Sequence, residues 1–397
     1  MNAFEFYSPT RVIFGPDAEQ KAGSYLRSRG VKKVMIHYGT GSVIRSGLLE
    51  RIKQNLEENG ISFAELGGVK PNPELPLVRR GIELCVRENT DFILAVGGGS
   101  VIDSAKAIAI GARNQDTDIW DYFVRKASEV RGHIPVGCVL TMAAAGSETS
   151  NSCVILDPKT RLKRSFNGDF DRPEVAFMNP RLLETVPLAQ RAYAVTDIMM
   201  HTLDRYFSAD TGNDLTDEIA EGLLRTVIRW GKRYVDDPGD YRAASEIMWC
   251  ASISHNQLTG LGNAGDFAVH ILGHELSAMF DAPHGATLSA IWRTWAEYVA
   301  AGNPGRYARY ARQVWGIHGR EGEEAETALE GIRRTDRYFQ ELPVPTGIQE
   351  LLGRPLTERE LAEMTEKCTL FGKIESVGTF RKLFKRDIAM IYGLANQ

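Results

Sequence analysis

The pattern of apolar residues changes near residue 185, and this change limits the possible folds more than any other feature. Before it, short apolar runs over residues 34–37, 91–96 and 134–140 alternate with helical patterns. Uniformly apolar runs followed by helices are typical of parallel strands covered on both faces. Beyond it the period is helical, without a convincing strand. Because 397 residues also exceed the usual size of one core, we predict an α/β domain over residues 1–185 and an all-helical domain over 186–397.

Three of the eight histidines, His270, His274 and His284, fall within fifteen positions. His270 and His274 are four residues apart, so on one helix their imidazoles point the same way. His284 can approach them from the next turn of chain. Neutral imidazole is a ligand for Zn, Fe, Ni and Cu, and the cluster therefore predicts a divalent transition-metal site.

A second helical pattern offers a carboxylate ligand. Asp197 and His201 are also four residues apart, and the residues around them are apolar, which indicates a buried face. A buried carboxylate without a partner is costly, so Asp197 needs a cation, hydrogen-bond donors or a metal. Histidines that merely satisfy core positions would explain either pair alone. The two pairs and His284 together favour a metal site.

Composition excludes several classes of function. The net charge of −4 gives no support for binding nucleic acid or an anionic membrane. No apolar run approaches the roughly 20 residues of a membrane span, and no signal peptide is recognised. The five cysteines are odd in number, dispersed and without CxxC spacing, as in a reduced cytoplasmic protein. An acidic run over residues 321–326 is predicted to be a solvated helix face.

Two glycine-rich turns follow predicted strands. In the first, residues 95–106, three glycines let the backbone approach a ligand, and free N–H groups at the helix start attract an anion. Its sequence is neither the GxGxxG fingerprint nor a Walker loop. The second turn, residues 38–42, lies after the first strand, where a Rossmann-like sheet usually meets its cofactor. Together the turns make a dinucleotide the best candidate ligand.

These motifs resemble those of the iron-containing (group III) alcohol dehydrogenases, and more closely those of their butanol dehydrogenase and NADPH-dependent aldehyde reductase branch. The matching elements are Pro71-Asn72-Pro73, Gly97-Gly-Gly-Ser100-x-x-Asp103-x-x-Lys106, Thr141 with Gly146-Ser147-Glu148, Asp197-x3-His201 and His270-x3-His274-x9-His284-Gly285. The resemblance extends over nearly the whole chain. It implies an α/β Rossmann-like dinucleotide-binding domain followed by an all-α metal-binding domain, which is the dehydroquinate synthase-like architecture. It also implies a homodimer.

The resemblance also implies roles for individual residues. Asp197, His201, His270 and His284 match the positions that coordinate Fe²⁺ or Zn²⁺, and His274 matches a histidine beside the substrate and nicotinamide. The positions that match cofactor contacts are Asn72, Gly98, Gly99, Ser100, Asp103, Thr141, Ser147 and Lys163.

One carboxylate and three neutral imidazoles leave a divalent ion with a charge near +1 and room for one more ligand, so that it can act as a Lewis acid on a carbonyl oxygen. His274 can relay the proton; the alternative is that it only orients a metal ligand. The other histidines, His37, His133, His255 and His318, have no partner in these motifs and are predicted to be structural or on the surface.

The turn at residues 38–42 bears on the choice of cofactor. NAD enzymes usually present an acid to the ribose 2′-hydroxyl, whereas this turn is Tyr38-Gly39-Thr40-Gly41-Ser42. Without an acid, a 2′-phosphate has room near Gly39, with Ser42 and Arg45 nearby. We therefore favour NADP(H) over NAD(H).

The predicted substrate is a small aliphatic aldehyde or alcohol, because Phe267, Ile271, Met279 and Phe280 lie near the metal motifs. Core packing explains these residues equally well. A lyase or cyclase of the dehydroquinate synthase type is one alternative, and a glycerol-type polyol dehydrogenase is another. A protein that only binds metal or nucleotide is the third.

Overall fold

The computed structural model describes residues 1–209, 212–319 and 322–397. Glu321, where the predicted acidic helix face begins, lies outside the described residues. The chain forms two compact units, Tyr7–Thr185 and Val186–Gln397, and Met1–Phe6 belongs to the second of them. The sequence prediction had placed those six residues in the first domain.

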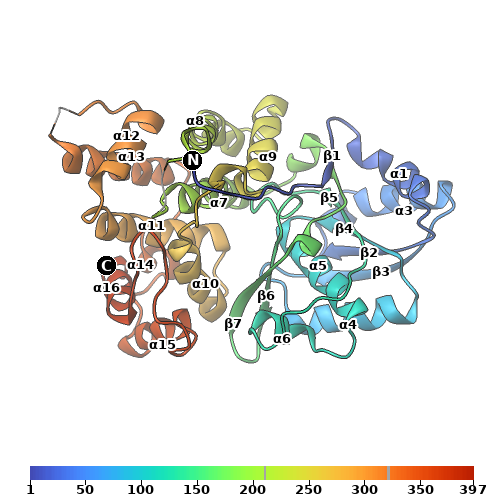
Figure 1. The fold of residues 1–397 in the computed structure, drawn as a ribbon. Coiled ribbons are helices and arrows are strands. Elements are labelled where there is room, and N and C mark those ends of the chain that lie inside the picture. Colours follow the sequence, from blue (N-terminus) through green and yellow to red (C-terminus); the bar gives the residue numbers. More distant parts are fainter. Residues whose placement is uncertain (210–211, 320–321) are drawn as a thin grey trace. The chain divides into compact units, whose positions relative to one another are not determined.

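The unit Tyr7–Thr185 contains a six-stranded parallel sheet in the order β1-β8-β5-β4-β2-β3 (Figure 1). Its strands are β1 (Arg11–Phe14), β2 (Lys33–Gly39), β3 (Ser62–Val69), β4 (Phe92–Gly97), β5 (Val136–Leu140) and β8 (Val175–Met178). The predicted runs at 34–37, 91–96 and 134–140 coincide with β2, β4 and β5, which confirms the α/β class.

Helices cover the sheet, and the central strand β4 is buried along its whole length. Side chains alternate between faces along a strand. Phe92, Leu94 and Val96 share a core cluster with residues of α1 (Ala22–Ser28) and α3 (Leu48–Glu58). The helix α5 (Gly99–Arg113) packs on β4 and against α4 (Leu75–Arg87). The shorter helices are α2 (Ser42–Arg45) and α6 (Ile119–Phe123).

Sequence patterns did not predict the remaining strands. The edge strand β3 contains Gly67, Gly68 and a glutamate, so it lacks the apolar run of a central strand. An antiparallel hairpin, β6 (Ser152–Asp157) and β7 (Leu162–Asn167), forms a separate two-stranded sheet. The polar sequence of β7, LKRSFN, hides its strand character.

His37 is a fully buried histidine of β2. Its Nδ1 lies 2.8 Å from the carbonyl oxygen of Leu66, and its Nε2 lies 2.9 Å from Oγ of Ser104. Since a carbonyl oxygen only accepts, Nδ1 carries the proton and Nε2 accepts from the serine hydroxyl. Burial lowers the pKa of His37 from 6.5 to about 4.

We expect His37 to make this unit sensitive to acid. The unfolded chain binds a proton at His37 near pH 6.5 and the folded chain only near pH 4. The contribution of neutral His37 to the free energy of unfolding is therefore fully present above pH 6.5 and is lost as the pH falls to 4. The loss is about 3 kcal/mol of unfolding free energy. His37→Asn should flatten this part of the pH profile in urea unfolding. The same substitution at the exposed His318 is the control, and equal slopes in both variants would contradict the expectation.

The second unit is helical. Its helices are α7 (Leu188–Tyr206), α8 (Asp214–Asp236), α9 (Tyr241–His255), α10 (Ala268–Phe280), α11 (His284–Ala300), α12 (Pro304–Trp315), α13 (Glu324–Glu341), α14 (Ile348–Leu352), α15 (Glu358–Cys368) and α16 (Lys385–Ala395). Among its described residues, an isolated bridge between Val377 and Leu383 is the only strand-like pairing. The predicted all-helical character is confirmed.

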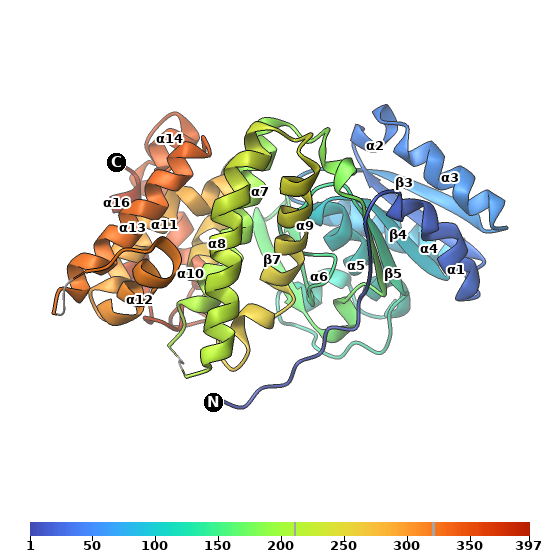
Figure 2. The ribbon, with the colours of Figure 1, turned by 90° about the horizontal axis from the view of Figure 1, so that it is seen from above.

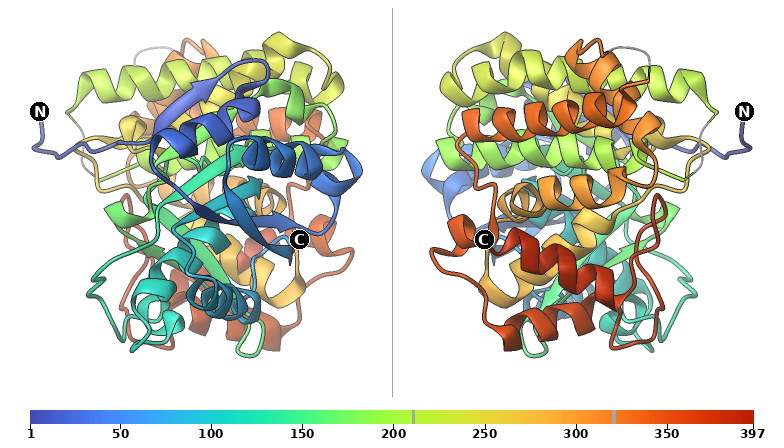
Figure 3. Two further views of the ribbon diagram at one scale, coloured as in Figure 1. Left: turned by 90° about the vertical axis from the view of Figure 1, so that its right-hand side faces the viewer. Right: turned by 90° about the vertical axis from the view of Figure 1, so that its left-hand side faces the viewer.

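The helix α7 forms the centre of this unit. It packs against α8, α9, α10 and α11, and Figure 2 shows α8 running alongside it. The later helices, orange to red in the right-hand view of Figure 3, pack on one another, with α12 against α13 and α15 against α16. A helix enclosed by others is buried on nearly every side, and every residue of α7 from Ala194 to Tyr206 is buried. Polar side chains on this helix must therefore find partners inside the protein.

In the part of the chain that the structure describes, no helix has both the length and the apolar character needed to cross a membrane.

Candidate functional site

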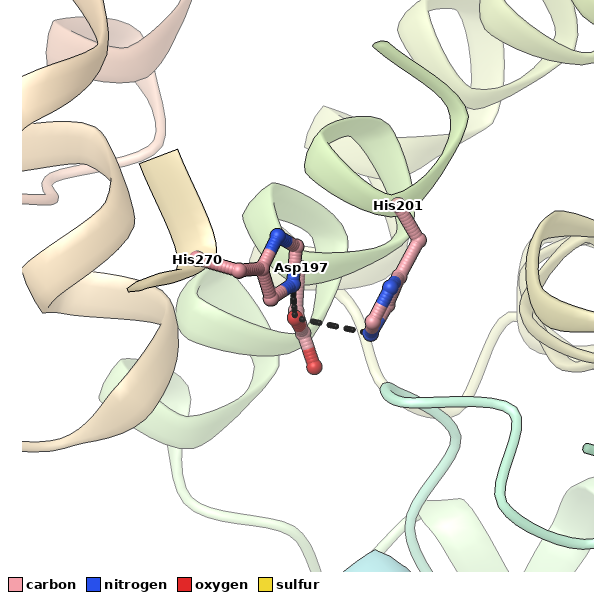
Figure 4. Close-up of side chains that lie close together, drawn as sticks. All are labelled: Asp197, His201 and His270. Carbon is pink, nitrogen blue, oxygen red and sulfur yellow. Dashed lines mark ion pairs between the residues drawn. The ribbon is translucent and has the colours of Figure 1, made fainter. Parts of the chain in front are cut away.

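Three predicted metal ligands meet around one carboxylate oxygen. Asp197 and His201 project from α7 and His270 from α10 (Figure 4), and their donor atoms lie within 4.8 Å of one another. Oδ1 of Asp197 is 3.5 Å from Nε2 of His201 and 3.7 Å from Nε2 of His270. Nε2 of His284, the first residue of α11, is also 3.7 Å from this oxygen.

Glycine accounts for the position of His284. A Cβ atom built on Gly285 would lie 2.2 Å from the carbonyl oxygen of Tyr193 in α7. Only a residue without a side chain lets the start of α11 come so close to that helix. Asp197 lies one turn after Tyr193 on α7. The close approach at Gly285 therefore brings the neighbouring His284 beside Asp197.

The donor atoms have the spacing of metal ligands. Separations of 3.5–3.7 Å are too long for hydrogen bonds, which span about 2.7–3.2 Å. Two ligands at about 2.0–2.2 Å from one tetrahedral ion lie about 3.3–3.6 Å apart. Oδ1 of Asp197 and Nε2 of His270 are both buried without a hydrogen-bond partner among the described residues. This donor set fits a divalent transition metal.

The protonation of the two buried imidazoles differs in the metal-free protein. Burial, reinforced by His255 and His270, holds the pKa of His201 well below its usual 6.5. Burial would also lower the pKa of His270, but the carboxylates of Asp197 and Asp204 outweigh it and raise the pKa to about 9.

His274 lies beside this donor set. Its ring centroid is 5.2 Å from that of His284 and 6.3 Å from that of His270, and the residue is only partly buried. His274 is therefore adjacent to the donor set, with part of its side chain exposed.

Two neighbours of the ligands were missed. His255 at the end of α9 was predicted to be structural or on the surface, without a partner in the motifs; its Nδ1 lies 2.8 Å from Nδ1 of His201. Asp204 was not singled out, yet its Oδ2 lies 2.5 Å from Nδ1 of His270. A sequence signal existed for Asp204, because it lies three residues after His201 and therefore one turn along α7.

Several of the predicted cofactor residues follow the carboxyl ends of β2, β4 and β5. Tyr38 pairs with Val96 across β2 and β4, so Gly39 and Gly97 end their strands at the same level. Gly97 pairs with Leu140 of β5, and the N–H of Thr141 donates to the carbonyl oxygen of Gly97. After β2 the chain continues to β3 on one side of this point, and after β4 it continues to β5 on the other side. Dinucleotides bind at such a switch point.

The turn between β4 and α5 is closely packed. A Cβ atom on Gly98 would lie 3.0 Å from Cβ of Met142, and one on Gly99 would lie 3.3 Å from Cβ of Ala145. Ser100 follows in the first turn of α5, where N–H groups remain available to an anion. A larger residue at Gly98 would displace the loop that begins at Thr141.

Asp103 and Lys106, on α5 after this turn, form hydrogen bonds with the segment that follows β5. Oδ1 of Asp103 accepts from the hydroxyl of Ser147 at 2.5 Å, and its Oδ2 accepts from the N–H of Val154 at 3.1 Å. Nζ of the buried Lys106 donates to the carbonyl oxygen of Ser152 at 2.8 Å. Asp103 and Ser147 thus bind each other, which fixes the loop that approaches Gly98 and Gly99.

The remaining predicted contacts are also placed in this unit. Asn72 precedes α4 with a left-handed φ of 58° and is 7 % exposed. Lys163 is buried on β7, opposite Leu156 of β6. Ser42 begins α2 and is exposed, as is Arg45 at the end of that helix. The left-handed conformation of Asn72 is uncommon for a non-glycine residue and often marks a functional turn.

Comparison with known proteins identifies the family of this chain. The family model described as iron-containing alcohol dehydrogenase matches residues 9–180, and the C-terminal model of the same family matches residues 191–395. The chain belongs to the iron-containing alcohol dehydrogenase family. The resemblance found in the sequence is thereby confirmed, and the protein is an alcohol dehydrogenase of this family.

Individual relatives cover most or all of the chain. It is 35 % identical over 393 residues to NADH-dependent butanol dehydrogenase A of Clostridium acetobutylicum, covering 99 % of each protein. It is 36 % identical over 292 residues to the NADPH-dependent aldehyde reductase YqhD of Escherichia coli, covering 73 % of this chain and 74 % of that protein. The crystal structure of NADH-dependent butanol dehydrogenase A from Thermotoga maritima superposes with a TM-score of 0.94 at 32 % identity, covering 100 % of this chain and 99 % of that one. These proteins share the dehydrogenase fold but differ in cofactor.

Proposed function

We propose that this dehydrogenase transfers hydride between NADP(H) and a small aliphatic aldehyde or alcohol, with Fe²⁺ or Zn²⁺ as its metal. The observation that carries the proposal is the buried Oδ1 of Asp197, without a hydrogen bond and with three imidazole nitrogens at 3.5–3.7 Å. We further propose that Tyr7–Thr185 is the dinucleotide-binding domain and the helical unit the metal-binding and substrate domain.

Asp197, His201, His270 and His284 would hold the ion, which when bound polarises the substrate oxygen as a Lewis acid. His274 is proposed to exchange a proton between that oxygen and water. Its partial exposure and its position next to His284 support this role.

The turn after β2 supports NADP(H). It has no acidic side chain for a ribose 2′-hydroxyl, and the nearest cation, Arg45, folds over Gly41: a Cβ atom on that glycine would lie 2.6 Å from Nη1. Arg45 forms no ion pair among the residues that the structure describes. A guanidinium without a carboxylate partner beside an open backbone turn suits a phosphate.

The proposed substrate class rests on apolar side chains of the helical unit. Phe267, Ile271, Met279 and Phe280 are each partly exposed rather than sealed in the core. Relatives named for butanol and for aldehydes are in keeping with such a surface.

The alternatives find less support. A phosphorylated, carboxylated substrate of the dehydroquinate type would need cations near the metal. Arg293 pairs with Glu297 and Asp336, and Arg205 donates to the carbonyl oxygen of His201 while stacking on Phe267. A glycerol-type polyol dehydrogenase remains the nearer alternative, although its metal sites usually carry fewer histidines.

Aldehyde-dependent oxidation of NADPH tests the reaction class. With butanal, we expect one NADPH to be oxidised for each butanol formed, followed by absorbance and by product analysis. A lyase would consume no net cofactor, and a binding protein would show tight NADPH binding without turnover. Either outcome would overturn the proposal.

The quaternary state and location also remain proposals. β1 lies at the edge of the sheet with Phe14 exposed, and such an edge can pair with a second copy. We propose a homodimer, to be tested by its mass in solution. The cytoplasmic location stays a prediction of the sequence.

A further inference from the structure

Asp204 is a buried carboxylate whose hydrogen-bonded oxygen is directed at a proposed metal ligand. It lies on α7, fully buried, and its Oδ2 is 2.5 Å from Nδ1 of His270. Its Oδ1 has no hydrogen-bond partner among the described residues. Burying a carboxylate costs several kcal/mol unless it is well paired. The hydrogen bond to His270 offsets part of this cost and holds the two side chains together.

His255 makes the corresponding contact to a second ligand. Its Nδ1 is 2.8 Å from Nδ1 of His201, and the two rings meet edge to face at a centroid distance of 4.0 Å and an angle of 86°. His201 is on α7 and His255 ends α9, so the contact joins two helices.

The carboxylate of Asp204 makes Nδ1 of His270 the donor, and the His255 contact allows the same arrangement in His201. A neutral imidazole has one N–H and one lone pair. If Nδ1 of His270 donates to Asp204, its lone pair is on Nε2, the atom 3.7 Å from Oδ1 of Asp197. If Nδ1 of His201 donates to Nδ1 of His255, its lone pair is likewise on Nε2, 3.5 Å from the same oxygen.

We propose that Asp204 and His255 are positioning residues that set Nε2 as the metal-binding atom of His270 and His201. The inference rests on the proposed metal site. Partners of this kind fix the tautomer and ring orientation of a ligand, and their loss typically weakens metal binding about 10–100-fold.

Three substitutions separate this role from a merely structural one. His255→Leu removes the acceptor, and we expect at least about 10-fold weaker metal binding. His255→Asn places an amide oxygen where Nδ1 lies, so it should restore affinity to within about 3-fold of the unmodified protein. Asp204→Asn keeps the shape but loses the charge, and we expect about 10-fold weaker binding. The control is His133→Leu at an exposed histidine of the other unit.

The measurement is Zn²⁺ affinity of the metal-free protein, by competition with a chelating indicator. The visible spectrum of the Co²⁺-loaded protein reports ligand geometry independently of activity. Equal affinity and identical Co²⁺ spectra for His255→Leu and the unmodified protein would overturn the role of His255. The same result for Asp204→Asn would overturn that of Asp204, and this near-isosteric variant decides the proposal if His255→Leu does not fold. Failure of the unmodified protein to bind Zn²⁺ or Co²⁺ would instead refute the proposed function.

Discussion

Replacing His270 or His284 by alanine is expected to abolish metal binding and nearly all activity. Each change removes one of the imidazoles around Asp197 Oδ1. A metal acting as Lewis acid supplies several kcal/mol of transition-state stabilisation, so kcat/KM should fall by about 1,000-fold or more. Metal content by mass spectrometry and turnover with NADPH and butanal measure the two effects.

The fold should survive these substitutions. His284 begins α11 at a partly exposed position. Removing His270 takes away the hydrogen-bond donor of the buried Asp204 and lowers stability, but α7 stays enclosed by the neighbouring helices and the fold is retained. Circular dichroism of the metal-free variants should match that of the unmodified protein, and His318→Ala, at an exposed position, is the control for loss of a histidine. Unchanged metal content in both ligand variants would show that the ligand set is wrong.

Gly39→Asp is expected to shift cofactor preference from NADPH toward NADH. The new carboxylate would accept from a ribose 2′-hydroxyl but repel a 2′-phosphate, and juxtaposed like charges cost several kcal/mol. The ratio of kcat/KM for NADPH to that for NADH should fall by about 100-fold or more. A side chain at Gly39 has room, because its Cβ would meet only the carbonyl oxygen of Val69 at 3.5 Å and a methyl group of Val101 at 3.9 Å.

A neutral side chain of equal size isolates the effect of charge. Gly39→Asn adds the same bulk, so a change common to both variants reports a steric effect, and the difference between them reports electrostatics. Unchanged or greater NADPH preference in Gly39→Asp would contradict the assignment of this turn to the 2′-phosphate.

Sequence patterns predicted those parts of the fold that have continuous apolar runs or side chains at helical spacing. The central strands are apolar on both faces, so their runs are continuous. Asp197 and His201 on α7, like His270 and His274 on α10, are four residues apart. The edge strand β3 and the hairpin strand β7 were missed because glycine and charged residues replace the apolar run. At such positions tertiary pairing decides the conformation.

The same limit decided which parts of the candidate site could be predicted. The i, i+4 pairs and the glycine turns are local patterns and could be read from the sequence. The contact of His255 with His201 joins residues 54 positions apart, and no periodicity predicts it. The need for glycine at position 285 likewise comes from the backbone of Tyr193 in another helix.

The most direct test of the central claim is a metal titration of the metal-free protein during aldehyde reduction. Fe²⁺ and Zn²⁺ are added separately while NADPH oxidation with butanal is followed. The arrangement around Asp197 predicts activity that rises from near zero and saturates at one ion per chain with at least one of the two metals. Full activity without metal, or activity that ignores added Fe²⁺ and Zn²⁺ alike, would contradict it.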